Sequence, residues 1–377
     1  MKIFIAQQNY HIGNFELNTQ KIIEAIKTAK AAGGDLILFS EMTVSGYPAR
    51  DFVEFEDFIE KCTASVNLIK EQADTIGVLI GSPVKNKHQK GKDLFNAAYF
   101  LYEKEVKAIV HKTLLPTYDV FDEYRYFEPA YEWNIMEFKG KKLAVTICED
   151  IWNLGDNPLY RICPMDELMK FNPDIMLNLS ASPFDYTHDE DRKPVIKSNV
   201  LKYKIPLFYC NAVGSQTEIV FDGASLVFDK HANLMKAFPL FEEAIDWVEL
   251  DENGLMSGPI LEPASRIPEK ELNPATLEPQ LNIEQVYQAL VSGIRDYFGK
   301  MGFTKANLGS SGGIDSAVTL AIACEALGAD NVRAILMPSP YSTEHSVNDA
   351  VALSKNLNNP YDIVQIDQVY NSFLKTL

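Results

Sequence analysis

Along the first 250 positions, segments with the hydrophobic pattern of strands alternate with segments that have the pattern of helices. Residues 2–8 combine β-branched and aromatic side chains, as strands do, whereas residues 15–32 carry apolar side chains at helical spacing and stop at Gly33-Gly34. Some predicted strands are close enough for hairpins and others need crossovers, which predicts a mixed sheet. The further predicted strands are residues 35–39, 76–81, 95–102, 106–111, 143–147, 174–179, 207–211 and 224–228.

Residues 251–280 interrupt this pattern. Five prolines fall between positions 252 and 280, and seven acidic residues stand against two basic ones between positions 249 and 280. Proline and repeated negative charge both oppose a packed core, so we interpret residues 251–280 as a linker. It would join a first domain, residues 1–250, to a second, residues 281–377.

The second domain again alternates helices and strands, but it has only three clear strands. We therefore expect this domain to be incomplete. The pattern predicts helices over residues 283–297, 314–327 and 346–357, strands over 306–309, 332–337 and 363–366, and a further helix at the end of the sequence.

Composition narrows the class of protein. The chain has 377 residues, of which 46% are hydrophobic and 23% charged, as in globular rather than disordered proteins. The net charge of −17 argues against nucleic acid or an anionic membrane as a partner, because both attract surfaces rich in Lys and Arg. It leaves room for a small anionic molecule held by backbone amides. No apolar run of 18 residues predicts a transmembrane helix, and the N-terminus turns polar too soon for a signal peptide.

Cysteine and histidine usage limits the redox and metal chemistry. Five cysteines without CxxC spacing favour a reducing compartment over a disulfide scaffold, so we expect a cytoplasmic protein. The six histidines are scattered and no HExxH motif occurs, which argues against a structural zinc site or a zinc protease.

Three chemically reactive residues each follow a predicted strand. Glu41, Lys112 and Cys148 occupy these positions, where open α/β sheets gather their reactive groups. Together they would form a catalytic site for acyl transfer. A thiolate whose pKa is lowered by the cation attacks an amide or nitrile, the carboxylate carries the proton, and the ammonium stabilises the oxyanion. Taken singly, a buried structural cysteine and two solvated charges explain them as well, and spacing alone does not join residues so far apart.

Four motifs around these residues resemble the carbon–nitrogen hydrolase (nitrilase) superfamily. The resemblance implies an α/β fold of the αββα sandwich type, with Cys148 as nucleophile, Glu41 as general base and Lys112 as the cation that stabilises the oxyanion. The motifs are Leu38-Phe39-Ser40-Glu41 with Gly46-Tyr47-Pro48, His111-Lys112-Thr113-Leu114-Leu115-Pro116, Ile147-Cys148-Glu149-Asp150-Ile151-Trp152, and Asn178-Leu179-Ser180-Ala181-Ser182-Pro183-Phe184.

The glutaminase branch of this superfamily suggests residues that contact L-glutamine. The resemblance assigns this contact to Tyr118 and Ser182, and it makes Glu123 a support for the lysine; a surface acid is the alternative reading of Glu123. Many members carry Gly-Lys or Gly-Arg where this chain has Thr187-His188, which makes His188 the candidate at that position.

A second motif lies between a predicted strand and a predicted helix in the second domain. Its glycines allow a tight turn, and consecutive amides at a helix N-terminus form an anion cradle; a serine/glycine turn that only caps the helix is the alternative. A carboxylate such as that of Asp315 is compatible with nearby phosphates if a divalent cation binds both. The motif is Gly309-Ser310-Ser311-Gly312-Gly313-Ile314-Asp315-Ser316.

This loop resembles the pyrophosphate loop of the N-type ATP pyrophosphatases, which adenylate an acid with ATP and let ammonia displace AMP. The segment from Met337 to Ser342 is similar to the NAD synthetase members, in which the position of Met337 borders the adenine pocket. The resemblance implies ATP as a substrate, Mg2+ at Asp315, and a Rossmann-like domain of the adenine nucleotide alpha hydrolase type.

Both halves together resemble the glutamine-dependent NAD synthetases. That resemblance implies amidation of deamido-NAD with ammonia from glutamine, and a homo-oligomer as the default state. Members of this family continue well beyond the position of Leu377, so we expect a complete glutaminase half and a deficient synthetase half. Two alternatives stay open: a stand-alone amidase or nitrilase with a vestigial tail, and a nucleotide-sensing subunit that needs a second chain.

Overall fold

The computed structural model describes residues 1–87, 90–154, 159–185, 188–251, 256–257 and 283–377. The chain divides into two compact units, residues 1–276 and 277–377. Most of the predicted linker, residues 251–280, lies outside the described residues, so its boundaries stay a prediction.

The first unit contains a seven-stranded mixed sheet. The central strands β1 to β4 have nearly continuous apolar sequence because helices cover one face of the sheet and a second sheet covers the other. The strands, in their order across the sheet, are β15 (Met256–Ser257), β14 (Ala244–Leu250), β1 (Lys2–Gln7), β2 (Leu36–Phe39), β3 (Gly77–Lys85), β4 (Leu94–Tyr102) and β5 (Glu105–His111).

A six-stranded mixed sheet packs against it. A separate two-stranded ribbon pairs β10 (Val213–Gln216) with β11 (Ile219–Asp222). The strands of the six-stranded sheet, in order, are β13 (Leu234–Ala237), β12 (Leu226–Phe228), β9 (Leu207–Asn211), β8 (Ile175–Ser180), β7 (Lys141–Ile147) and β6 (Met136–Phe138).

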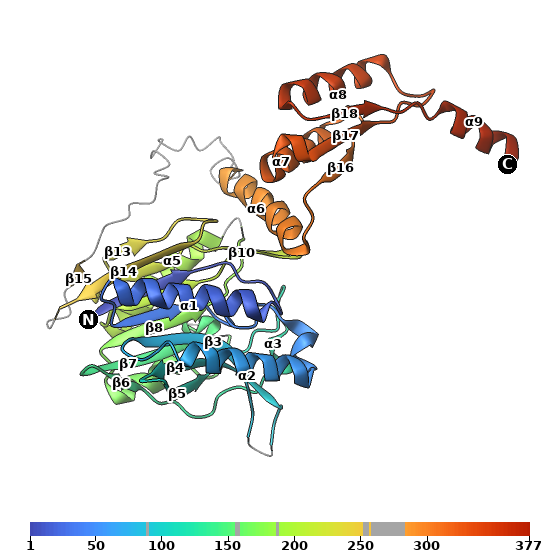
Figure 1. Cartoon of the computed structure of the whole chain (residues 1–377). Helices are drawn as coiled ribbons and strands as arrows, with labels where there is room; N and C mark the ends of the chain where they lie inside the picture. Colours follow the sequence, from blue (N-terminus) through green and yellow to red (C-terminus); the bar gives the residue numbers. More distant parts are fainter. Residues whose placement is uncertain (88–89, 155–158, 186–187, 252–255, 258–282) are drawn as a thin grey trace. The chain divides into compact units, whose positions relative to one another are not determined.

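The two sheets and their outer helices form four layers (Figure 1). Alternate residues of β1 show the division: Ile3 and Ile5 enter the core between the sheets, whereas Phe4 and Ala6 pack toward the helices. The predicted αββα sandwich with mixed sheets is therefore confirmed. The helices are α1 (Phe15–Ala31) and α2 (Glu56–Lys70) on the first sheet, α4 (Pro164–Leu168) and α5 (His188–Tyr203) on the second, and the short α3 (Glu123–Tyr126).

The second unit is built on a parallel three-stranded sheet. Its apolar residues form a core of their own between the sheet and its helices. The elements are α6 (Ile283–Met301), β16 (Ala306–Gly309), α7 (Ile314–Leu327), β17 (Val332–Leu336), α8 (Glu344–Leu357), β18 (Tyr361–Ile363) and α9 (Asp367–Thr376), with the strands in the order β16-β17-β18.

The predicted strand over residues 363–366 is wrong in position. Its pairing explains the difference: β18 runs parallel to residues Ala334–Leu336 of β17, and β17 ends at Leu336. Beyond Ile363 the amides of Val364 and Ile366 donate to the carbonyls of Leu336 and Pro338 over 2.8 and 3.5 Å, and these isolated bonds do not extend the strand ladder. Among the described residues, no helix combines the length and the hydropathy needed to cross a membrane.

Candidate active site

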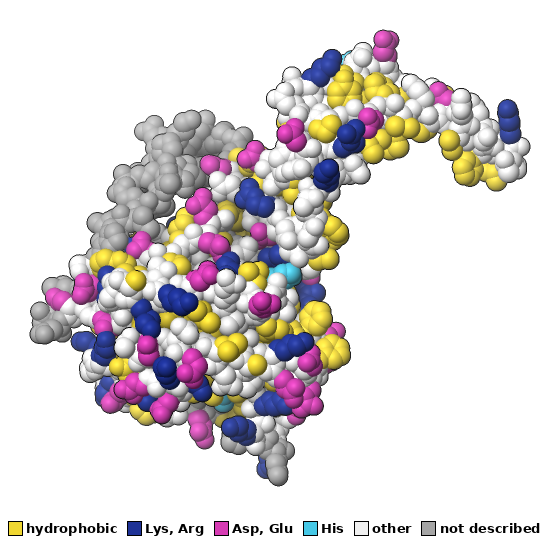
Figure 2. Space-filling view, viewed as in Figure 1, with side chains coloured by type: hydrophobic (Ala, Val, Ile, Leu, Met, Phe, Trp, Pro, Cys, Tyr) yellow, Lys and Arg dark blue, Asp and Glu magenta, His cyan; other side chains and the backbone are white. Residues whose placement is uncertain are grey.

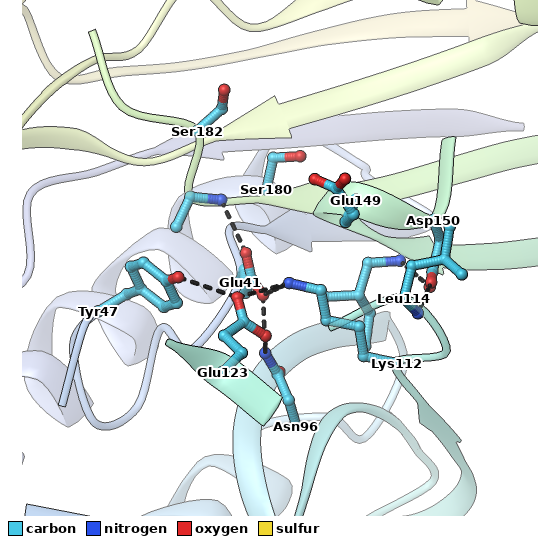
Figure 3. Close-up of polar contacts among 12 residues, drawn as sticks. Glu41, Tyr47, Asn96, Lys112, Leu114, Glu123, Glu149, Asp150, Ser180 and Ser182 are labelled. Carbon is cyan, nitrogen blue, oxygen red and sulfur yellow. Dashed lines mark hydrogen bonds and ion pairs between the residues drawn. The ribbon is translucent and has the colours of Figure 1, made fainter. Parts of the chain in front are cut away.

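The three reactive residues predicted from the sequence gather where the two sheets meet. Glu41 follows β2, Lys112 follows β5, and Cys148 follows β7 in the other sheet. The Glu41 amide donates to the Ser180 carbonyl over 3.3 Å, and the Ala181 amide donates to Glu41 Oε2 over 3.1 Å. The strand ends of the two sheets are thus joined by hydrogen bonds at the acid itself (Figure 3).

One buried ammonium group binds two buried carboxylates. Lys112 Nζ lies 2.8 Å from Glu41 Oε1 and 2.7 Å from Glu123 Oε1, and none of the three side chains is more than 5% exposed. Burial alone would lower the pKa of Lys112, but the charges of Glu123 and Glu41 outweigh it and hold that pKa well above its ordinary value. Lys112 is therefore a permanent cation, and the reading of Glu123 as a surface acid is wrong.

Hydrogen-bond donors surround the two carboxylates. The Tyr47 hydroxyl donates to Glu123 Oε1 over 2.9 Å, and Asn96 Nδ2 lies 2.7 Å from Glu41 Oε1 and 3.3 Å from Glu123 Oε2. Burial raises the pKa of Glu123; Lys112 opposes this rise and Glu41 adds to it. Tyr47 stands out in the sequence only as part of a motif, and Asn96 was not among the predicted site residues.

Cys148 occupies a strained turn between β7 and the 3-10 helix η2 (Cys148–Ile151). Its φ is +42°, which is unusual for a residue other than glycine, and its side chain is almost fully buried. Asp150 fastens this turn to the loop that carries Lys112. Its carboxylate accepts the amides of Ile147, Thr113 and Leu114 over 2.8–3.0 Å, although burial raises its pKa to about 7.

The expected lowering of the thiol pKa is wrong. Burial, followed by the negative charge of Glu41, raises the pKa of Cys148 well above its ordinary value, and the opposing effect of Lys112 is too small to reverse this. Near neutral pH the resting sulfur is therefore a protonated thiol, which needs a base when it attacks.

Cys148 opens onto a cavity of about 210 Å3. Tyr118, Glu149 and Ser182 line the same cavity, so two of the residues predicted to contact glutamine are there. The Tyr118 hydroxyl donates to Glu149 over 2.9 Å. Burial raises the pKa of Glu149, and the charge of Lys112 and the hydrogen bonds from Tyr118 and Tyr160 oppose this rise. Glu149 directly follows Cys148 in the sequence, which is the signal that could have identified it.

A buried network fixes Ser182 at the cavity wall. The Ser182 amide donates to Asn211 Oδ1 over 2.8 Å, and Asn211 Nδ2 lies 3.3 Å from Asp222 Oδ1. Arg192 of α5, which is 1% exposed, pairs with Asp222 at 2.9 Å. The side chain of His188, the third predicted contact, lies outside the described residues, so its role stays a prediction.

The serine and glycine loop of the second unit connects β16 to α7 as predicted. Its amides are partly used within the protein: those of Ser311 and Gly313 donate to the hydroxyls of Ser316 and Ser311, each over 3.2 Å, and that of Ser310 to the Ile335 carbonyl. Only part of the expected row of consecutive donors is therefore free of protein partners in this conformation.

Two observations still fit an anion at this loop. The Ser310 hydroxyl is buried and has no hydrogen-bond partner among the described residues. Gly312 has φ +80°, and a Cβ there would lie 2.2 Å from the Ser346 carbonyl oxygen, so only glycine allows this close turn. A cavity of about 240 Å3 adjoins the loop, with Met337 in its wall.

Asp315 stands exposed in the first turn of α7. Among the residues that the structure describes, no group of three His, Cys, Asp or Glu side chains could hold a metal by itself. Mg2+ is usually held by one or two carboxylates together with substrate phosphates. A single carboxylate beside an anion loop therefore fits Mg2+ that arrives with a nucleotide.

Comparisons with known proteins match both units. The carbon-nitrogen hydrolase family model matches residues 2–256, and the NAD synthase family model matches residues 286–377. The glutamine-dependent NAD(+) synthetase of a Synechocystis strain is 38% identical over 94% of this chain, and that of Thermotoga maritima is 34% identical over all of it. The chain spans 62% and 67% of the lengths of these two relatives.

Solved structures agree with this result. The glutamine-dependent NAD+ synthetase of Acinetobacter baumannii, determined in complex with ADP, superposes with a TM-score of 0.85 at 33% identity, over 100% of this chain and 66% of that one. An amidase from Nesterenkonia sp. AN1, 19% identical, shares the fold over 67% of this chain and 94% of its own, with a TM-score of 0.58. The chain therefore belongs to the carbon–nitrogen hydrolase family, in the branch of the glutamine-dependent NAD(+) synthetases.

Proposed function

We propose that the first unit hydrolyses L-glutamine to glutamate and ammonia through a thioester on Cys148. The observation that carries this proposal is the buried cluster in which Lys112 holds Glu41 and Glu123 while Glu41 and Lys112 both act on the Cys148 thiol. A cation, a base and a thiol in one dry site are the parts that acyl transfer from an amide requires.

The first half-reaction forms the thioester. Glu41 takes the thiol proton as Cys148 Sγ attacks the side-chain carboxamide carbon, and the Lys112 ammonium stabilises the negative oxygen of the tetrahedral intermediate. The C–N bond then breaks, and the proton held by Glu41 passes to the nitrogen, which leaves as ammonia. A base is needed because the raised pKa of Cys148 keeps the resting thiol protonated.

The second half-reaction releases glutamate. Glu41, ionised again, takes a proton from water as the water oxygen attacks the thioester carbon. Lys112 stabilises the second tetrahedral intermediate, the C–S bond breaks, and the proton returns to the Cys148 sulfur. Each group ends in its starting state, as a catalyst must.

The cavity supports an amino-acid substrate. Its volume of about 210 Å3 is below the roughly 300–1,000 Å3 of pockets for drug-sized ligands. We propose that Tyr118, Ser182 and His188 contact glutamine, and that Glu149, whose carboxylate lines the cavity, receives the α-ammonium group.

We propose that the second unit contributes to ATP-dependent amidation of deamido-NAD to NAD. The loop from Gly309 to Ser316 would hold the phosphates of ATP, and Met337 would border the adenine. Mg2+ bound by Asp315 and the phosphates would supply charge neutralisation when ATP adenylates the nicotinate carboxylate. Ammonia from the first unit would then displace AMP, with pyrophosphate as the other product. Release of ammonia inside the protein would keep it deprotonated and locally concentrated.

We place this reaction in the cytoplasm and expect a homo-oligomer. All five cysteines of the structure are free thiols, which suits a reducing compartment. Light scattering of the purified protein at several concentrations would test the assembly, and a monomer at every concentration would contradict it.

A covalent intermediate tests the glutaminase proposal. The protein is incubated with glutamine, quenched in acid and digested, and the peptides are examined by mass spectrometry for a γ-glutamyl adduct. We expect the adduct on Cys148, and neither adduct nor glutamate release in the Cys148→Ala variant. An adduct on Cys62, Cys163, Cys210 or Cys324 instead would overturn the proposal.

Product analysis tests the synthetase proposal. The protein is given glutamine, ATP, Mg2+ and deamido-NAD, and glutamate, AMP and NAD are measured together. Formation of AMP that requires the intact Gly309–Ser316 loop supports the proposal. Glutamate release that ignores ATP and deamido-NAD, with no ATP binding, would instead indicate a stand-alone amidase. Nucleotide binding without glutamate release would indicate a sensing subunit.

A further inference from the structure

The catalytic cluster has an excess of negative charge. Two carboxylates share the single ammonium of Lys112, and all three groups are buried. One cation compensates one anion, so the second carboxylate needs other donors if it is to stay ionised in this site. Without them the two acids would share a proton, as paired buried carboxylates do, and neither would be a dependable base.

Asn96 supplies donors to both acids at once (Figure 3). It lies on β4 and is 1% exposed; its backbone carbonyl accepts the amide of Lys112 over 2.8 Å, which fixes it beside that lysine. Its side-chain nitrogen donates to Glu41 over 2.7 Å and to Glu123 over 3.3 Å. An amide nitrogen has two hydrogens and accepts none, so it can serve two carboxylates and cannot take a proton from either.

The side-chain amide of Asn96 is oriented in a way that is unfavourable for its oxygen, and this indicates the role of its nitrogen. Asn96 Oδ1 is buried without a hydrogen-bond partner among the described residues. An unpaired buried acceptor is unfavourable, and turning the amide over would place its oxygen against two carboxylates. The group is therefore held with its donors toward the acids.

We infer that Asn96 is a positioning residue that keeps Glu41 ionised and separate from Glu123, so that Glu41 is ready to accept the Cys148 proton. This inference rests on the proposed glutaminase function. The titratable groups that interact with Glu41 come from several elements: Lys112 after β5, Glu123 of α3, Tyr47 from the loop after β2, and Cys148 at η2. Asn96 is a neutral donor placed among these charges.

Loss of this donor has a direct consequence for pH dependence. Loss of a hydrogen bond to an ionised group typically raises the proton affinity of that group about 10- to 100-fold, or by about one to two pH units. The Asn96→Ala variant should therefore show an acidic limb of kcat/KM that lies about one to two units higher than in the wild type. At the acidic end of the pH range, kcat/KM of the variant should be about 10- to 100-fold lower than that of the wild type, and much of this difference should vanish at alkaline pH.

The experiment measures glutamate release by the full chain from about pH 5.5 to 9. Asn96→Asp keeps the shape of the side chain but adds a third carboxylate, so it should be less active than Asn96→Ala at pH 8 and should recover as the pH falls. Asn178→Ala is the matched control. Asn178 is fully buried on β8, and within the described part of the chain its side chain bonds the hydroxyls of Thr146 and Ser180, so its variant should keep the wild-type midpoint.

The outcomes separate this inference from the proposed function. If the wild type forms no thioester and releases no glutamate, the proposed function fails. If the wild type is active and Asn96→Ala lowers kcat equally at every pH, Asn96 is merely structural and the inference is overturned. A shifted acidic limb in Asn96→Ala, with none in Asn178→Ala, supports it.

Discussion

Replacing Glu41 by glutamine should make Cys148 more reactive toward an alkylating reagent while abolishing turnover. In the wild type, burial and then Glu41 raise the pKa of the thiol, and Lys112 lowers it. The substitution removes the negative charge and leaves the cation in place. The pKa of Cys148 must then fall, so the thiolate is populated at lower pH. Hydrolysis fails for a separate reason, because the amide of glutamine cannot take the thiol proton.

The size of the effect follows from the charges around the sulfur. For a generic pair of unit charges separated by about 5 Å, at an effective dielectric constant of about 20, Coulomb's law gives about 3 kcal/mol, or about two pKa units, and we use this as the scale for removing one neighbouring charge. A fall of that size raises the thiolate fraction near neutral pH about 100-fold. Each thiolate is also less nucleophilic, by about tenfold for the same fall, which leaves a net gain of about tenfold in alkylation. Loss of the base should cost about 100- to 10,000-fold in kcat.

The assay follows carbamidomethylation of each cysteine by mass spectrometry after timed exposure to iodoacetamide between about pH 6 and 9. Cys163, which is partly exposed, serves as an internal reference thiol. Glu123→Gln is the matched variant: Glu123 acts more weakly than Glu41 on the sulfur, so its alkylation should rise less. Unchanged or slower alkylation of Cys148 in Glu41→Gln at every pH would refute this account of the thiol.

Three further substitutions test the framework of the site. In Gly81→Ala, the new Cβ would lie 2.3 Å from the Met42 amide nitrogen and must displace the turn that carries the base, so kcat should fall at least tenfold in steady-state assays and the midpoint of thermal unfolding should fall as well; full activity would contradict this. Asp150→Asn loses an acceptor for one of three backbone amides and should lower the free energy of unfolding, measured in urea, by about 1–3 kcal/mol; an unchanged midpoint would refute that role. Lys112→Met leaves two carboxylates without their cation, which raises their proton affinity in the folded state. Its deficit of about 3–5 kcal/mol at pH 8 should shrink toward pH 5, as the carboxylates bind protons, and a pH-independent deficit would disprove this reasoning.

The site residues that were not predicted from the sequence differ from those that were, because their role depends on partners that are distant in the chain. Glu41, Lys112 and Cys148 carry reactive groups directly after apolar strands, so local pattern alone marks them as candidates. Asn96 interrupts the apolar run of β4, which is a signal, but its partners belong to the segment after β2 and to α3. Its task exists only once those elements surround it.

The predicted strands show the same difference between what local sequence determines and what distant partners determine. Strands with strong apolar runs were located to within a few residues, whereas β14 was missed although it pairs along the whole of β1. Its first four residues are only partly buried, so the sequence there shows little alternation between apolar and polar residues. Residues 363–366 were misplaced because the partner strand, and not their own composition, sets where β18 ends.

The sequence by itself predicted a mixed sheet and a second α/β unit and marked Glu41, Lys112 and Cys148 as candidates, because apolar periodicity and the residues that follow a strand are local properties of the chain. The αββα sandwich was predicted from the resemblance of the four motifs to a known family. Tertiary structure alone decided the protonation state of Cys148. Burial and the charge of Glu41 act on the sulfur through space, and together they outweigh the cation that the sequence also supplies. It likewise decided that Glu123 is a buried partner of Lys112, since the 2.7 Å contact arises only when α3 folds over the end of β5.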